Sequence, residues 1–238
     1  MSNNRLPRTS DFGLLTSPAP ALQAVAVLRS PFAEKFGVPR QGNLAPHVIS
    51  EVVLEPAFRG TDCLRGLEGF SHLWLIWGFH CNGNDWHPTV RPPRLGGNTR
   101  IGVFASRSPF RPNGLGLSVV KIVSVEQGVI RVSGADMVDG TPIYDIKPYV
   151  PYSDAVPDAA SGFTAAPWEP LAVQLPPQLP AGVTPDWVAA LRETLAQDPR
   201  PAYQDDPQRV YHLILRPFEI DFRVEAGTVI VTAIRPHA

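Results

Sequence analysis

Arginine side chains dominate one stretch of the chain that contains no carboxylate. Between Trp86 and Val125 the 238-residue sequence carries six basic residues and neither Asp nor Glu. The guanidinium group presents a rigid fork of donors that matches phosphate or carboxylate, and its plane stacks on bases. A solvated surface face is the alternative, but such faces usually mix signs and favour lysine. The stretch therefore predicts an anionic partner that can also be aromatic. The six residues are Arg91, Arg94, Arg100, Arg107, Arg111 and Lys121.

The loops around these arginines, from Val90 to Ser118, are rich in glycine and proline. Glycine permits close approach of the backbone to a ligand, whereas proline fixes a loop and reduces the entropy lost on binding. This composition is typical of rigid anion-recognition loops. The glycines are Gly96, Gly97, Gly114 and Gly116, and the prolines are Pro92, Pro93, Pro109 and Pro112.

Carboxylates gather just downstream, in the sequence DMVDGTPIYD. Asp136, Asp139 and Asp145 lie near the end of an expected strand and over an Asp-Gly turn. Clustered carboxylates accept hydrogen bonds from the amines of a ligand or act as a base. Asp139 begins the Asp-Gly-Thr-Pro sequence, where we expect its carboxylate to cap the turn.

Sequence motifs of several enzyme classes are missing. The chain has neither GxGxxG nor GxxxxGK[ST], which argues against a Rossmann-type site and a P-loop. Without GxSxG or HExxH, a nucleophile elbow or a helical zinc site has no support. His72, His80, Cys81 and His87 are close in sequence, but their spacing matches no known ligand pattern. We expect no bound metal.

The amino-acid composition limits the possible fold classes and the cellular location of the protein. The 27 prolines and 19 glycines are too many for a helical bundle and favour short strands, turns and ordered loops. A net charge of −1 hides a basic first part, up to residue 135, and an acidic remainder. Two cysteines without a CxxC pair, no secretory leader and no apolar run long enough for a membrane span indicate a soluble, cytoplasmic protein.

The elements that position the arginines and carboxylates are predicted to be β-strands. Residues 1–21 are polar, lack periodicity and are expected to form a disordered tail. Within residues 22–150, short strands with hardly any helix between them indicate an antiparallel sheet that closes on itself or packs as a sandwich, and we favour a small barrel. The expected strands are 22–29, 48–55, 72–80, 100–105, 117–125 and 129–133.

A second, smaller unit follows. Residues 151–183 are rich in proline and resemble a linker. Thr184, Pro185 and Asp186 then supply an N-cap, an N1 proline and an acidic first turn for a helix that stops before Pro199. Three strands complete a small α+β unit, residues 184–238. We expect these strands at 209–216, 218–224 and 228–234.

Four segments in this order and spacing resemble the TsaA-like (YaeB, TrmO) family. They are AVLRSPFAEKFGVPRQ, RGLEGFSHLWLIWGFH, RPPRLGGNTRIGVFASRSPFRPNGLGLS and DMVDGTPIYDIKPYVPY. The resemblance covers about residues 22–152, and its most specific part is GVFASRSPFRPN, residues 102–113. Bacterial members carry a comparable small C-terminal domain.

The resemblance implies an S-adenosylmethionine-dependent tRNA methyltransferase. Family members methylate N6 of N6-threonylcarbamoyladenosine next to the anticodon, use a small β-barrel rather than a Rossmann fold, and work as homodimers. The implied partners are the tRNA anticodon stem-loop and a second copy of the chain. The methyl-donor residues implied by the family pattern are Arg40, Gln41, Gly42, Asn43, Leu44, His80, Cys81, Arg107, Leu117, Val132, Ser133, Gly134 and Ala135.

Two departures from the family pattern fall within this set. Gly42-Asn43 replaces the Pro-Gly that often follows Pro-Arg-Gln, and Cys81 stands where many members have glutamine. Backbone contacts survive both changes more readily than side-chain hydrogen bonds.

Methyl transfer to a carbamoylated adenine nitrogen requires removal of its proton. Asp136 is our first candidate for the base and His80 the second. Cation–π attraction of the sulfonium to Trp74, Trp77 and Phe79 is conceivable, but such a stripe is more often core. The phosphates of the tRNA are assigned to Arg91, Arg94, Arg100 and Arg111.

Two alternatives from other classes share the arginine-rich face. A non-catalytic RNA-binding module would need no donor pocket. An enzyme acting on a small anionic metabolite would be indifferent to tRNA. Composition does not distinguish these two functions from methyl transfer, and the family resemblance favours methyl transfer.

Overall fold

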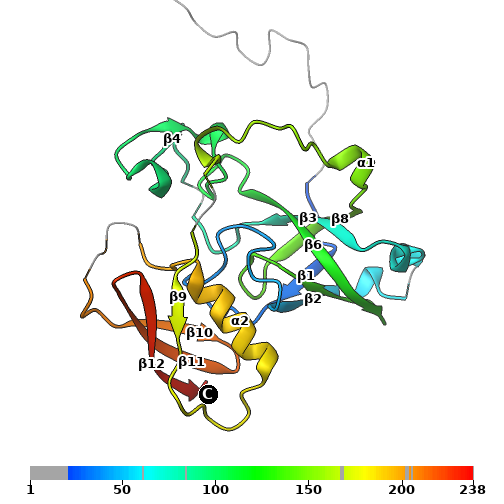
Figure 1. The fold of residues 1–238 in the computed structure, drawn as a ribbon. Helices are drawn as coiled ribbons and strands as arrows, with labels where there is room; N and C mark the ends of the chain where they lie inside the picture. Colours follow the sequence, from blue (N-terminus) through cyan, green and yellow to red (C-terminus); the bar gives the residue numbers. More distant parts are fainter. Residues whose placement is uncertain are drawn as a thin grey trace, which may run out of the picture.

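Side chains along the N-terminal strands alternate between buried and more exposed positions, as a sheet with one covered face requires. The computed structural model describes residues 21–60, 62–83, 85–166, 169–201, 204 and 206–237. All of the expected disordered tail except its last residue lies outside these ranges. Within them the chain forms a closed barrel and a separate four-stranded sheet (Figure 1).

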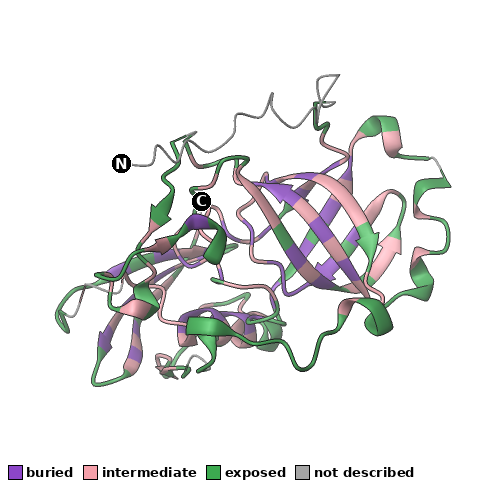
Figure 2. Ribbon diagram, turned by 90° about the horizontal axis from the view of Figure 1, so that it is seen from above, coloured by how far each residue is buried: buried purple, intermediate pink, exposed green. Residues whose placement is uncertain are grey.

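The barrel has six strands in the order β1-β2-β7-β6-β3-β8, and every neighbouring pair is antiparallel. Closure leaves no free sheet edge, which confirms the predicted small antiparallel barrel. Figure 2 shows the buried stripes along its strands. The strands are β1 (Ala26–Arg29), β2 (Ile49–Leu54), β3 (His72–Gly78), β6 (Leu115–Glu126), β7 (Val129–Ser133) and β8 (Pro142–Pro148).

Aliphatic side chains fill the interior of the barrel. Leu28, Leu73, Leu75 and Ile143 are fully buried there. Their β-branched and leucine neighbours from β2, β6 and β7 complete the cluster. The barrel is therefore a packed core, and any ligand must bind at its end or on its outside.

The predicted strands differ from the observed ones at two places. Strand β8 was not expected, because prolines occupy both of its ends and polar residues occupy its middle. Residues 100–105 were expected to be a barrel strand, but only β5 (Ile101–Gly102) is extended, and it pairs with β4 (Thr89–Val90) outside the barrel. A 3-10 turn follows at Val103–Ala105. The arginine-rich segment is thus mostly loop, as its glycines and prolines favour.

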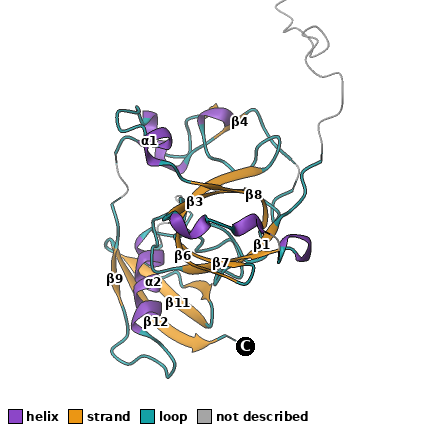
Figure 3. Cartoon of the chain, turned by 90° about the vertical axis from the view of Figure 1, so that its right-hand side faces the viewer, coloured by secondary structure: helices purple, strands orange, loops and turns teal. Residues whose placement is uncertain are grey.

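The second sheet has the order β10-β11-β12-β9. Its strands are β9 (Ala172–Gln174), β10 (Tyr211–Leu215), β11 (Phe218–Glu225) and β12 (Thr228–Pro236), and helix α2 (Pro185–Ala196) packs on one face (Figure 3). Thr184 caps α2 by accepting a hydrogen bond from the backbone N–H of Trp187, as the sequence predicts. We call this assembly, from β9 to β12, the C-terminal unit.

The stretch expected to be a linker is partly structured. Strand β9 lies within it and pairs parallel with β12. A short helix, α1 (Pro151–Asp154), opens the same stretch. The structured part of the C-terminal unit therefore begins before residue 184, and its proline content concealed the short edge strand.

The two β units are joined by the loop between β1 and β2. Phe32, Ala45 and Val48 of this loop are buried in the same cluster as Leu191 of α2 and Leu213 of β10. A backbone hydrogen bond runs from Arg216 N to Pro31 O, 2.9 Å. This loop, residues 30–48, thus belongs to the core of the C-terminal unit, although it connects two strands of the barrel.

Candidate active site

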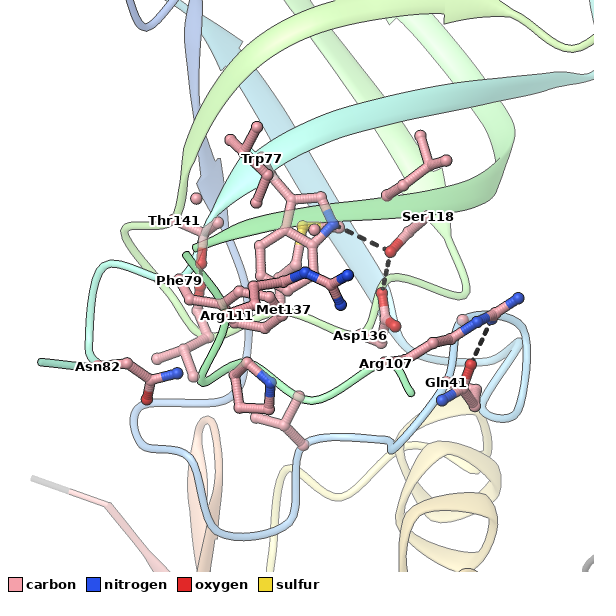
Figure 4. A pocket seen from close by; sticks show the side chains of 18 of the residues that line it. Gln41, Trp77, Phe79, Asn82, Arg107, Arg111, Ser118, Asp136, Met137 and Thr141 are labelled. Carbon is pink, nitrogen blue, oxygen red and sulfur yellow. Dashed lines mark hydrogen bonds between the residues drawn. The ribbon is translucent and has the colours of Figure 1, made fainter. Parts of the chain in front are cut away.

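A cleft of about 870 Å³ opens at one end of the barrel. It is formed by four segments: the β1–β2 loop, the end of β3, the loop before β6 with the start of β6, and residues 136–141. Figure 4 shows polar side chains from these segments around it, with Trp77 behind them. The volume is within the range of sites that hold a nucleoside-sized ligand.

A chain of hydrogen bonds runs from the barrel core to the cleft. Trp77 Nε1 donates to Ser118 Oγ at 3.0 Å, and Ser118 Oγ donates to Asp136 Oδ1 at 2.6 Å (Figure 4). Strand β3 supplies Trp77, and its neighbour β6 supplies Ser118. A Cβ at Gly116 would lie 2.3 Å from the Trp77 ring, so only glycine leaves room for the indole there.

Burial raises the pKa of the Asp136 carboxyl above its ordinary value. Hydrogen bonds from Ser118 and from the backbone, including that of Gly42, and the charge of Arg107 act in the opposite direction but do not cancel it. A carboxylate with a raised pKa takes up a proton more readily near neutral pH than an exposed one does. Asp136 is therefore suited to act as a base in the cleft.

Residues 42 and 43 of the β1–β2 loop are held against the end of β7. Asn43 N donates to Gly134 O at 2.9 Å, and Asn43 Nδ2 donates to Val119 O at 3.1 Å. Gly134 has φ +80°, and a Cβ on it would lie 2.6 Å from Asn43 Oδ1. A Cβ on Gly42 would meet Val119 O at 3.3 Å. The two glycines thus allow this loop to lie directly on the strand ends beside Asp136.

Gln41 connects the same loop to the arginine-rich segment. Its side-chain oxygen accepts a hydrogen bond from Arg107 at 2.5 Å (Figure 4). On the opposite wall, His80 lies between Cys81 and Thr141, with Nε2 3.1 Å from Cys81 Sγ and Nδ1 3.4 Å from Thr141 Oγ1. The cleft therefore brings together residues more than a hundred positions apart in sequence.

Most of the residues that the family resemblance assigns to the donor line this cleft, but five of them do not. The lining includes Arg40, Gln41, Gly42, Asn43, His80, Cys81, Arg107 and Leu117, together with Asp136. The five that are not part of the lining are Leu44, Val132, Ser133, Gly134 and Ala135.

Their positions explain this. Val132 is fully buried in the barrel core, and Ser133 Oγ bonds to Pro46 O. Gly134 and its neighbours support the loop that faces the cleft. Arg40 lines the cleft, but its guanidinium also donates to the carbonyls of Asp198 and Arg200 in the C-terminal unit.

The four arginines assigned to RNA do not form one group. Arg111 lines the cleft and donates to Ser106 O at 3.2 Å. Arg94 donates to Ala166 O at 2.8 Å and so holds the segment that follows α1. Arg91 and Arg100 are exposed on the segment that carries β4 and β5.

Asp139 lies outside the lining, and its carboxylate bonds to other segments of the chain instead of capping its own turn as expected. Its Oδ1 accepts from Ser30 N at 3.0 Å, and its Oδ2 pairs with Arg216 at 2.8 Å. The carboxylate therefore ties the turn to the start of the β1–β2 loop and to the C-terminal unit.

Sequence reasoning missed several residues of the cleft, among them Ser118 and Phe104. Ser118 was not selected, because an isolated serine in an alternating strand carries no signal of its function. Phe104 lines the cleft and is 79% exposed. In the sequence, Phe104 could be noticed only as an aromatic residue within a segment rich in arginine and glycine.

In the described part of the chain, no three or more His, Cys, Asp or Glu side chains are grouped so that they could hold a metal ion. Among the described residues, no helix is long and apolar enough to cross a membrane.

The cleft fits a methyl donor of the size of S-adenosylmethionine. Its lining joins a partly buried carboxylate, the closely packed loop around Gly42, and the aromatic side chains of Trp77 and Phe79. Such a lining offers acceptors for an amine or a ribose hydroxyl and π faces for a sulfonium.

Comparison with known proteins gives consistent results. The chain is 40% identical over 229 residues to the Escherichia coli protein named tRNA (adenine(37)-N6)-methyltransferase, covering 90% of this chain and 97% of that one. An Eikenella corrodens protein of the same name is 50% identical over 170 residues, 69% of this chain and 97% of that one. A crystal structure of TrmO from Pseudomonas aeruginosa has a TM-score of 0.78 at 34% identity, covering 92% of this chain and 99% of that one.

Family models divide the chain in the same way as the two β units. Residues 27–155 match the tRNA-methyltransferase O N-terminal domain, and residues 169–237 match the TrmO C-terminal domain. With both models matched, and with relatives aligned over nearly their whole length, the chain belongs to the tRNA-methyltransferase O family.

Proposed function

We propose that this protein transfers a methyl group from S-adenosylmethionine to N6 of adenosine 37 in tRNA, and that the substrate is N6-threonylcarbamoyladenosine. The observation that carries the proposal is Asp136, a carboxylate with a raised pKa in a cleft beside an arginine-rich segment. Relatives that align over nearly their full length bear the name tRNA (adenine(37)-N6)-methyltransferase.

The residues of the cleft have different roles in the reaction. The donor supplies an electrophilic methyl group, and the protein chiefly aligns the target nitrogen with it. Asp136 accepts the N6 proton as the new carbon–nitrogen bond forms and the bond to sulfur breaks. Ser118 and the backbone of Gly42 orient the carboxylate.

Donor binding is assigned to the loop around Gly42 and to the wall opposite it. Gln41, Gly42 and Asn43 lie on one side, with His80 and Cys81 on the other. Arg107, held by Gln41, stands where the donor site meets the arginine-rich segment. Residues 132–135 lie at the end of β7 and support this loop, and Leu44 accepts a hydrogen bond from Gln197 through its carbonyl.

RNA binding is assigned to the exposed part of the arginine-rich segment. Arg91, Arg100 and Arg111 neutralise phosphates of the anticodon stem-loop, while Arg94 shapes the surface by holding residues 164–166. Phe104 offers an exposed ring at the edge of the cleft, and bases of single-stranded loops stack on such rings.

The working unit is proposed to be a homodimer in the cytoplasm, where the tRNA is found. Leu117, which also lines the cleft, and Val123 support dimer formation, because both are large, apolar and exposed on β6. Exposed apolar side chains on one strand are a common basis for association between copies.

The test is methyl transfer by the purified protein to synthetic anticodon stem-loops, followed by nucleoside mass spectrometry. We expect a gain of one methyl group on N6-threonylcarbamoyladenosine and little on unmodified adenosine. Equal methylation of both would remove the threonylcarbamoyl requirement. RNA binding without donor binding would favour the non-catalytic module, and no response to RNA would favour a small anionic substrate.

A further inference from the structure

We propose that the C-terminal unit holds the donor side of the cleft in its binding-competent shape and so sets the affinity for the methyl donor. The inference rests on the proposed function, and it assigns a task to a unit whose described residues contribute no side chain to the lining of the cleft. Arg216 and Glu193 are the positioning residues that carry it.

The first observation concerns apolar contacts between the β1–β2 loop and the C-terminal sheet. Phe36 of the β1–β2 loop stacks on Tyr211 and Phe222 of the C-terminal sheet, with ring centroids 6.3 Å away in both cases. Gly37, at φ +90°, lies so close to β10 that a Cβ on it would be 2.0 Å from Leu213 Cδ1. The loop is thus packed onto the sheet immediately before it reaches the cleft.

Polar contacts with helix α2 and its C-terminal end fix both sides of the cleft-facing residues. Arg40 donates to the carbonyls of Asp198 and Arg200 at 2.9 and 3.1 Å. Beyond the cleft, Gln197 donates to Leu44 O at 3.3 Å, and His47 N donates to Glu193 at 2.9 Å. A cation at the carboxyl end of a helix is also favoured by the helix dipole.

Residues 41–43 lie between these two attachments, and they contact residues around the cleft. Gln41 meets Arg107, Gly42 donates to Asp136, and Asn43 bonds to Gly134. A loop fixed at both ends loses less conformational entropy when a ligand binds its middle. The contacts with α2 therefore favour donor binding without touching the donor.

A second attachment acts on the segment that carries Asp136. Arg216 pairs with Asp139 at 2.8 Å, and Asp139 also accepts from Ser30 N. Asp139 is three residues from Asp136. One side chain of the C-terminal unit thus restrains both the carboxylate segment and the start of the β1–β2 loop.

The experiment compares Arg216→Ala and Glu193→Ala with a matched control, Arg235→Ala. Arg235 makes an ion pair of the same length, 2.8 Å, and is exposed to a similar degree, but its partner Asp221 lies within the C-terminal unit. Calorimetry gives the dissociation constant of S-adenosylmethionine, and single-turnover assays give the rate at saturating donor. Hydrogen exchange reports on the amides of residues 39–48.

We expect Arg216→Ala and Glu193→Ala each to weaken donor binding roughly tenfold, the loss of about one charged hydrogen bond. The donor KM should rise with the rate at saturating donor retained, and exchange at residues 41–44 should quicken. Arg216→Lys should restore part of the affinity, and Arg235→Ala should match the wild type.

Unchanged donor affinity in both variants would overturn the inference. So would an equal loss in Arg235→Ala, since the effect would then follow general stability, which melting temperatures measure in parallel. Failure of the wild-type chain itself to bind S-adenosylmethionine is a distinct result, and it would reject the proposed function.

Discussion

Ser118 Oγ donates a hydrogen bond of 2.6 Å to Asp136 Oδ1, from a strand adjacent to the one that carries Trp77. This bond favours the charged carboxylate and opposes the effect of burial on its pKa. The protonation of the proposed base therefore depends on the balance between burial and hydrogen bonds such as this one from β6.

Replacing Ser118 with alanine should raise the pKa of Asp136 further, because one hydrogen bond to its charged form is lost. The acidic limb of the pH–rate profile should move to higher pH. The Trp77 indole N–H would also lose its partner, at a cost of about 1–3 kcal/mol in unfolding free energy. Single-turnover rates across pH test this, with Ser124→Ala on the same strand as the control. An unmoved limb would contradict it.

Asp136→Asn should reduce the single-turnover rate of methyl transfer at least about a hundredfold if the carboxylate is the base. Stability should not fall. Because the folded pKa is raised, the favourable contribution of Asp136 is present below its unfolded pKa and is lost as pH rises through the folded value. At neutral pH the neutral amide should leave the melting temperature equal or higher. Full single-turnover activity would exclude Asp136 as the base and direct attention to His80.

Asp139→Asn should lower stability by about 1 kcal/mol at neutral pH. Partial burial acts to raise the pKa of Asp139, but the hydrogen bonds from Arg216 and Ser30 and nearby guanidinium charges lower it overall. Its contribution is therefore present above the unfolded pKa and is lost as pH falls through the folded one. Denaturant titrations at neutral and acidic pH should show the deficit shrinking in acid. Asp145→Asn, at an exposed ion pair, is the control.

Alanine at Arg91, Arg100 or Arg111 should weaken tRNA binding and reduce the slope of log affinity against log salt by about one unit each. Arg94→Ala should instead act on stability, because Arg94 holds the carbonyls of Thr164 and Ala166. Filter binding over a range of salt concentrations separates the two classes. Unchanged slopes for the first three variants would mean that they do not contact phosphates.

The sequence predicted the barrel because short apolar strand signals follow one another with hardly any helix between them. Strand β8 lacked that signal, since only one of its seven residues, Ile143, is fully buried. Residues 100–105 showed an apolar pattern but are flanked by glycine and proline loops that keep them outside the barrel.

The site was predictable where the chemistry is local and unpredictable where it depends on distant pairs. Asp136 stood out as a carboxylate at a strand end. By contrast, Arg216 and Asp139 are 77 positions apart, and His47 and Glu193 are 146 positions apart. No local pattern encodes such pairs, because they arise only when the β1–β2 loop packs on the C-terminal sheet.

Phe32, Ala45 and Val48 of the β1–β2 loop share a hydrophobic core with the C-terminal unit, and this has a consequence for the evolution of the protein. Without the C-terminal unit these three side chains would face water. Loss of the unit by truncation alone would leave an apolar surface beside the cleft, prone to association. We therefore expect a relative that consists of the barrel alone to carry more polar residues at the positions equivalent to Phe32, Ala45 and Val48.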